Sequence, residues 1–200
     1  LSCGHCLAAG ENGFPEMELS AAIDLIHQVR DMGVKEFLVS GGEPLSRNDI
    51  PEITDYLGRM GQKWSLNTAV LPDRAQQEAL ERNSPAFVAV SLDGPREVHD
   101  EFRGEEGSWD AAMEAIRFFR SLPGTRVCAG TTVTTHNYPS LEMTFHQVVR
   151  SGAHQWGIHL LVPEGRAALR KDLFLSRGQL RKLIRFVARK RNYFPVEMAD

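Results

Sequence analysis

The feature that most constrains the fold is the regular alternation of short apolar runs with longer amphipathic segments. The apolar runs, each followed by turn residues, predict strands at 36–40, 63–67, 87–91, 126–135 and 155–161. Most of these runs end about 25 residues apart, which is the length of one strand with one helix. Near-continuous apolar strands joined by helices indicate an α/β fold in which helices cover a parallel sheet.

The amphipathic segments predict the helices of this fold, because their apolar residues recur at steps of three and four. The segments with this pattern are 19–29, 109–119, 141–149 and 180–187. Weaker patterns predict two more helices, at 49–60 and 73–82. The residues that stand where helix N-caps are expected are Ser108, Ser140 and Ser176.

The composition excludes several classes of protein. The 200 residues are 42% hydrophobic and 24% charged, which suits a single domain, 1–200, with an ordinary core. The formal net charge of −3 indicates that the chain has no strongly basic field to hold nucleic acid or an anionic membrane. No apolar run reaches the roughly 18 residues of a membrane helix. Cys3 and Cys6 lie too close together for an ordinary structural disulfide, which favours a reducing, cytoplasmic location.

Polar residues, glycine and proline follow every predicted strand. These segments are 41–44, 67–68, 91–95, 134–137 and 161–163. The carboxyl ends of parallel strands share one edge of a sheet, and α/β proteins bind their ligands at that edge. The sequence therefore predicts a ligand site there.

Cys3 and Cys6 form a Cys-x-x-Cys motif that suits three kinds of site. A thioredoxin-like dithiol needs a helix that starts at the first cysteine, whereas Gly10, Gly13 and Pro15 follow here. A zinc site needs two further ligands at suitable spacing, and the sequence shows no such pair. An iron–sulfur cluster needs another thiolate, which is expected just upstream of Leu1. The motif alone leaves the three alternatives open.

The chain resembles the core of the radical SAM enzymes along essentially its whole length. Residues 1–6 match the last six positions of that family's Cys-x-x-x-Cys-x-x-Cys loop, whose first cysteine would lie two residues before Leu1. Residues 41–44, Gly-Gly-Glu-Pro, match a second family motif about 35 residues later. Residues 91–95 and 99–104, with 131–137 and 161–167, are similar to the SPASM-type subgroup, which modifies peptides and often carries a C-terminal extension for further clusters.

The resemblance implies a fold, a reaction and two cofactors. The fold would be a partial (β/α)6 barrel, open on one side, and this fragment would hold five strands and about six helices, the first strand preceding Leu1. A 4Fe–4S cluster bound by Cys3, Cys6 and the upstream cysteine would reductively cleave S-adenosylmethionine (SAM). The resulting 5′-deoxyadenosyl radical would abstract hydrogen from a substrate, expected to be a peptide. A flavodoxin or ferredoxin would supply the electron, and no residue of the chain is assigned a catalytic role.

The resemblance also implies how SAM is held at its ammonium group. The backbone carbonyls of Gly41 and Gly42 can come close because these residues have no side chain. Together with Glu43 they would accept charge-assisted hydrogen bonds from the ammonium. Pro44 would hold the turn.

The rest of SAM would meet residues from other strand ends. Ser91 would donate to the carboxylate or the ribose, and Arg103 would pair with the carboxylate. His5 and Val162 would enclose the adenine. The predicted cofactor site also includes Asn67 and Asp93.

Two rival functions follow from the same residues. One is a non-catalytic peptide-binding module on this fold, although such a module need not keep both cysteines and residues 41–44. The other is a zinc or dithiol protein that uses Cys3 and Cys6.

Several reactive or charged residues are assigned no functional role. Cys128 is predicted to be a small buried hydrophobe, and the basic run of the last helix is predicted to be a solvated face. The histidines without ligand spacing are His27, His136, His146, His154 and His159.

Overall fold

The computed structural model describes Cys3, Cys6 and residues 16–199. Its strands are β1 (Glu36–Val39), β2 (Lys63–Thr68), β3 (Phe87–Ser91), β4 (Arg126–Val133), β5 (Gln155–Leu160) and β6 (Val196–Ala199). Its α-helices are α1 (Leu19–Asp31), α2 (Ile50–Arg59), α3 (Arg74–Arg82), α4 (Arg96–Arg103), α5 (Ser108–Ser121), α6 (Leu141–Ser151) and α7 (Arg177–Lys190). Four short 3-10 helices are η1 (Pro44–Ser46), η2 (Tyr138–Ser140), η3 (Gly165–Leu169) and η4 (Lys171–Leu173). None of the helices in these residues has the length and apolar character that crossing a membrane requires.

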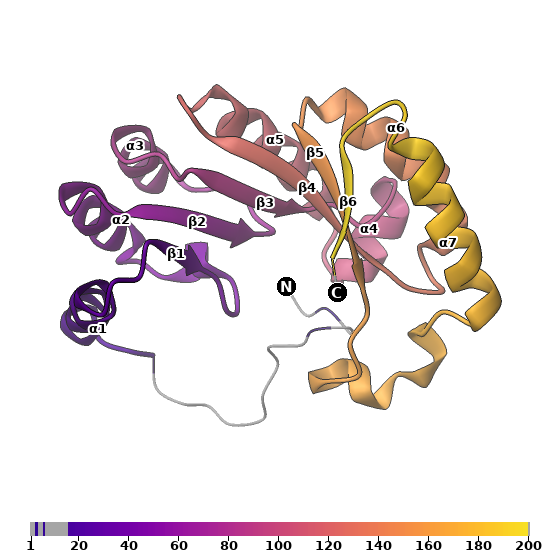
Figure 1. Ribbon diagram of the computed structural model, residues 1–200, viewed down its shortest axis with the longest axis horizontal. Coiled ribbons are helices and arrows are strands. Elements are labelled where there is room, and N and C mark those ends of the chain that lie inside the picture. The colour runs from indigo at the N-terminus through magenta and orange to yellow at the C-terminus, as the bar shows by residue number, and fades with distance from the viewer. Residues whose placement is uncertain (1–2, 4–5, 7–15, 200) are drawn as a thin grey trace.

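The strands form one parallel sheet whose spatial order follows the chain, from β1 to β6. Crossovers of one hand between successive strands place the connecting helices on the same face of the sheet. Figure 1 shows the strands fanned side by side, with α2 and α3 near β1 and β2, and α6 and α7 at the other end. Among the described residues β1 and β6 do not pair with each other. The prediction of a partial barrel, open on one side, is therefore confirmed.

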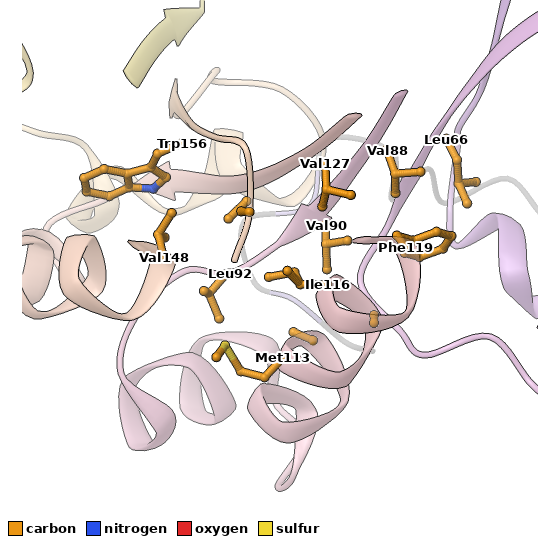
Figure 2. Close-up of a cluster of buried hydrophobic side chains, with 14 of the residues drawn as sticks. Leu66, Val88, Val90, Leu92, Met113, Ile116, Phe119, Val127, Val148 and Trp156 are labelled. Carbon is orange, nitrogen blue, oxygen red and sulfur yellow. The ribbon is translucent and has the colours of Figure 1, made fainter. Parts of the chain in front are cut away.

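The core lies between the sheet and its helices. Val88 and Val90 of β3 point toward Ile116 and Phe119 of α5, and all four side chains are fully buried (Figure 2). Each such side chain contributes about 1.5–3 kcal/mol of transfer free energy. The core fixes β3, and therefore the loop that follows it, against α5.

The opposite face of the sheet carries small residues inside the open barrel. Ala89, Cys128, Gly130 and Gly157 alternate there with the helix-facing side chains. A Cβ atom on Gly157 would lie only 3.0 Å from the Cys128 sulfur, so the two strands leave no room for a larger residue. Cys128 is buried, as predicted, and burial raises the pKa of its thiol to about 11.

The structure corrects the predicted elements at two places. Strand β6 is a sixth strand, because residues 196–199 pair with β5 beyond the five strands that were expected. Helix α4 was also not predicted. It has only eight residues and follows directly on Pro95, so it shows too few apolar positions for a helical pattern.

The predicted N-caps have mixed outcomes. Ser176 caps α7 and forms a capping box with Gln179, as predicted. Ser140 precedes α6 without a side-chain cap hydrogen bond. Ser108 is the first residue of α5 and not its cap, because the Asp100 carboxylate accepts hydrogen bonds from the first turn of the helix.

Candidate functional site

The loops that follow β1 to β4 meet at one edge of the sheet, since all strands run in the same direction. The loop after β1 contains Gly41, whose φ of +134° is a conformation that side-chain-bearing residues rarely adopt. Gly41 and Gly42 are exposed, whereas Pro44 is buried at the start of η1. The loop therefore presents its backbone to solvent at the predicted ammonium site.

Glu43 ties this loop to the end of β2. Its Oε1 accepts hydrogen bonds from the Leu45 amide at 3.1 Å and the Thr68 hydroxyl at 2.7 Å. Its Oε2 accepts one from the Ala69 amide at 2.8 Å. These three donors fix the carboxylate at the sheet edge while leaving a lone pair on Oε2 for a further donor.

Asp93 and Arg103 form a buried ion pair at the end of β3. Arg103 donates from Nε to Oδ2 of Asp93 at 2.7 Å and from Nη2 to the same oxygen. Asp93 is completely buried and Arg103 is 8% exposed. Burial alone would lower the pKa of Arg103, but the adjacent Asp93 carboxylate raises it, so the guanidinium stays charged. Arg103 therefore pairs with Asp93 in the interior and not with neighbours on the surface of α4.

Three further residues hold Asp93 in place. Its Oδ1 accepts from the Thr132 amide at 2.8 Å, and its carbonyl accepts from Asn137 Nδ2 at 2.8 Å. Its own amide donates to His99 Nδ1 at 3.0 Å. Sequence reasoning did not assign these residues to the site. The polar residues 134–137 after β4 were the available signal, whereas the contact with His99 depends on the unpredicted helix α4.

Cys3 and Cys6 lie on one turn beside this ion pair. The Cys6 amide donates to the Cys3 carbonyl at 3.3 Å, and the Cys6 carbonyl accepts from the Arg166 amide at 3.1 Å. Both cysteines are free, and Arg103 Nη1 lies 3.7 Å from the Cys3 sulfur. Two thiols on one turn fit two protein ligands of an iron–sulfur cluster. No group of three His, Cys, Asp or Glu that could hold a metal occurs among the described residues.

Three further predicted residues, Asn67, Ser91 and Val162, lie at the same edge, outside these two networks. Asn67 at the end of β2 donates to Ser40 Oγ at 3.4 Å. Ser91 is half-buried at the end of β3. Val162 follows β5 and is 39% exposed. His5 lies outside the described residues.

The buried His99 ring predicts a pH dependence of stability. Burial lowers the pKa of His99, so the folded state holds a neutral ring, whereas an unfolded histidine binds a proton near pH 6.5. The unfolded state therefore takes up more protons, and stability falls as the pH drops below about 6.5. We expect His99→Asn, which keeps an acceptor for the Asp93 amide, to reduce this loss between about pH 7 and pH 5.

Urea unfolding across that pH range measures the effect. The matched control is His27→Asn, because His27 is 50% exposed and should leave the slope unchanged. An unchanged slope in His99→Asn would show that the buried ring does not cause the pH dependence.

The comparison with known proteins decides the family. The model of the radical SAM superfamily matches residues 1–148 of this chain. The chain belongs to the radical SAM superfamily. Enzymes of this superfamily use a 4Fe–4S cluster and SAM, so the family predicted from residues 1–6 and 41–44 is confirmed.

Two curated relatives show the same level of similarity. An AdoMet-dependent heme synthase of Nitratidesulfovibrio vulgaris is 32% identical over 190 residues, which cover 92% of this chain and 51% of the relative. The mycofactocin maturase MftC of Mycolicibacterium smegmatis is 32% identical over 196 residues, covering 95% of this chain and 49% of the relative. The chain thus spans about half the length of the curated relatives it matches.

A solved structure that contains S-adenosylmethionine shares the fold. The crystal structure of Streptococcus suis SuiB bound to S-adenosylmethionine superposes with a TM-score of 0.82 at 17% identity. The match covers 99% of this chain and 47% of SuiB. The partial barrel described above is therefore also present in SuiB.

Proposed function

We propose that this chain forms the core of a radical SAM enzyme that cleaves SAM and abstracts a hydrogen atom from a substrate. The observation that carries the proposal is the meeting of three elements at one sheet edge. These elements are the Cys3–Cys6 turn, the Glu43 loop and the buried Asp93–Arg103 pair. A surface that only docked a partner would not require two free thiols, one of them 3.7 Å from a buried guanidinium.

Cys3 and Cys6 are proposed to hold a 4Fe–4S cluster together with a third cysteine, two positions before Leu1. When bound, the cluster supplies the electron that breaks a C–S bond of SAM and releases a 5′-deoxyadenosyl radical. The chain contributes a turn that places both thiols at the mouth of the barrel.

The loop after β1 is proposed to bind the ammonium group of SAM. The backbone of Gly41 and Gly42 is accessible, and Glu43 adds a fixed negative charge. Ser91 is proposed to donate to the carboxylate or ribose, with Asn67 beside it, and His5 and Val162 are proposed to enclose the adenine. Arg103 was predicted to pair with the SAM carboxylate. Two nitrogens of its guanidinium already donate to Asp93, so only Nη1 remains for a further partner.

The substrate is proposed to be a peptide. The alignment with mycofactocin maturase, which covers 95% of this chain, supports this class. The heme synthase relative, at the same identity over 92% of the chain, makes a tetrapyrrole the second candidate. Both classes are consistent with hydrogen abstraction by the same core.

The experiment uses the full-length protein, reconstituted anaerobically with iron and sulfide. We expect at least about four irons per chain, the content of one 4Fe–4S cluster, and an EPR spectrum of the reduced cluster that changes when SAM is added. Deuterated peptide and deuterated porphyrin are then supplied separately, and deuterium in 5′-deoxyadenosine identifies the substrate class. Zinc without iron would support the zinc alternative, and a signal that does not respond to SAM would support a non-catalytic binding module.

A further inference from the structure

Arg103 contacts the first of the two cysteines as well as Asp93. Its Nη1 lies 3.7 Å from the Cys3 sulfur, and the same sulfur lies 3.9 Å from the Arg103 carbonyl oxygen. Cys3 is 7% exposed and Arg103 is 8% exposed, so little water separates or screens the two groups. The contact joins residues 100 positions apart and is therefore a product of the fold.

The Asp93 carboxylate determines which nitrogen of Arg103 faces the sulfur. Nε and Nη2 both donate to Oδ2 of Asp93, which occupies one side of the planar guanidinium. The Thr132 amide holds the other carboxylate oxygen, so Asp93 cannot turn away. Nη1 is left at the free corner of the fork, directed at Cys3. A lysine, with one ammonium, cannot make both sets of contacts.

A donor at this position changes the energy of a cluster that Cys3 binds. Hydrogen bonds to the cysteine sulfurs, net charge and solvent exposure set the reduction potential of iron–sulfur clusters. The reduced cluster carries one more negative charge than the oxidised cluster. A buried N–H donor of a cation next to a cysteine sulfur therefore stabilises the reduced form more than the oxidised form.

We propose that Arg103, oriented by Asp93, is a positioning residue that donates from Nη1 to the Cys3 sulfur and raises the reduction potential of the bound cluster. The proposal rests on the proposed function, because it requires Cys3 to be a cluster ligand. The redox step is a one-electron transfer from an external donor of the flavodoxin or ferredoxin class, with dithionite as the donor in the test. No covalent bond forms or breaks in this step.

The test is an EPR-monitored redox titration of the full-length, iron-loaded protein without SAM. In Arg103→Gln we expect the ratio of reduced to oxidised cluster at a fixed potential to fall about tenfold, which corresponds to about 59 mV. Arg103→Lys keeps the charge and loses the fork, so a smaller fall is expected. The matched control is Arg96→Gln on the same helix, because Arg96 forms an exposed pair with Asp110 and should leave the ratio unchanged.

A second variant covers the case in which Arg103→Gln fails to fold with an unpaired Asp93. The double variant Asp93→Asn, Arg103→Gln removes both charges, and we expect it to show a fall of the ratio in the same direction. A folded, fully iron-loaded variant with the wild-type potential would overturn the proposal and leave the proposed function intact. A loss of SAM affinity at unchanged potential would overturn it in favour of the carboxylate role. A wild-type protein that binds no iron would overturn both.

Discussion

Asp93→Ala should lower the free energy of unfolding by about 3–5 kcal/mol, the cost of breaking a buried ion pair by removing one partner. The substitution leaves the Arg103 guanidinium buried without its carboxylate and the Thr132 amide without its acceptor. Because single domains are stable by only about 5–15 kcal/mol, the variant should approach global unfolding at moderate temperature. Urea unfolding followed by circular dichroism measures the difference.

The control for this prediction is Asp110→Ala. Asp110 pairs with Arg96 at the other end of α4, but their side chains are 51% and 47% exposed. An exposed pair of this kind contributes roughly 0–1 kcal/mol. If Asp93→Ala costs no more than Asp110→Ala, the buried pair does not stabilise this edge of the sheet.

Glu43→Gln should weaken SAM binding by about 1.5–3 kcal/mol, roughly ten- to a hundredfold in Kd, because a charge-assisted hydrogen bond to the ammonium is lost. The substitution should also lower the free energy of unfolding by about 1–3 kcal/mol. In the wild type, Leu45 and Thr68 donate to one carboxylate oxygen of Glu43 and the Ala69 amide donates to the other. Glutamine has only one such oxygen, so one of these two sets of donors would face its NH2 group and lose its acceptor. Calorimetric titration of the iron-loaded protein with SAM measures the loss of affinity separately from the loss of stability, because only folded molecules bind SAM.

The matched control is Glu36→Gln in β1, the strand that precedes the Glu43 loop. Glu36 lies at the opposite end of β1, where its carboxylate accepts from Lys63 and Ser65. Like Glu43 it is an acid that accepts hydrogen bonds from β2, but it lies away from the carboxyl ends of the strands, so SAM affinity should not change. If Glu43→Gln binds SAM with wild-type affinity, the carboxylate does not bind the ammonium and only holds its loop in place.

Local pattern was sufficient to predict most of the fold. The strands at β1, β2 and β3 and the helices α5, α6 and α7 follow from periodicities that a single element carries within itself. Helix α4 and strand β6 were missed because each is short. Contacts with other parts of the chain stabilise both elements, and such contacts leave no periodic pattern in the sequence of the element itself.

The candidate site was predictable in location but less so in its connections. Parallel strands had to bring the loops around Glu43 and Asp93 to one edge, and they do. The sequence did not reveal that Arg103 turns back onto Asp93, because the contact requires α4 to fold over the end of β3. The first amides of α5 donate to the Asp100 carboxylate and not to Ser108, and this too could not be predicted because Asp100 lies on α4.

The sequential strand order also bears on how the chain acquires its structure during synthesis. Each strand pairs with the strand made just before it, so the sheet can grow from β1 onward while the ribosome is still elongating the chain. The hydrogen bonds of Glu43 become available as soon as β2 has emerged. The Cys3 turn is different: its partner Arg103 follows 100 residues later, so the turn stays exposed on the ribosome until β1, β2 and β3 have been made.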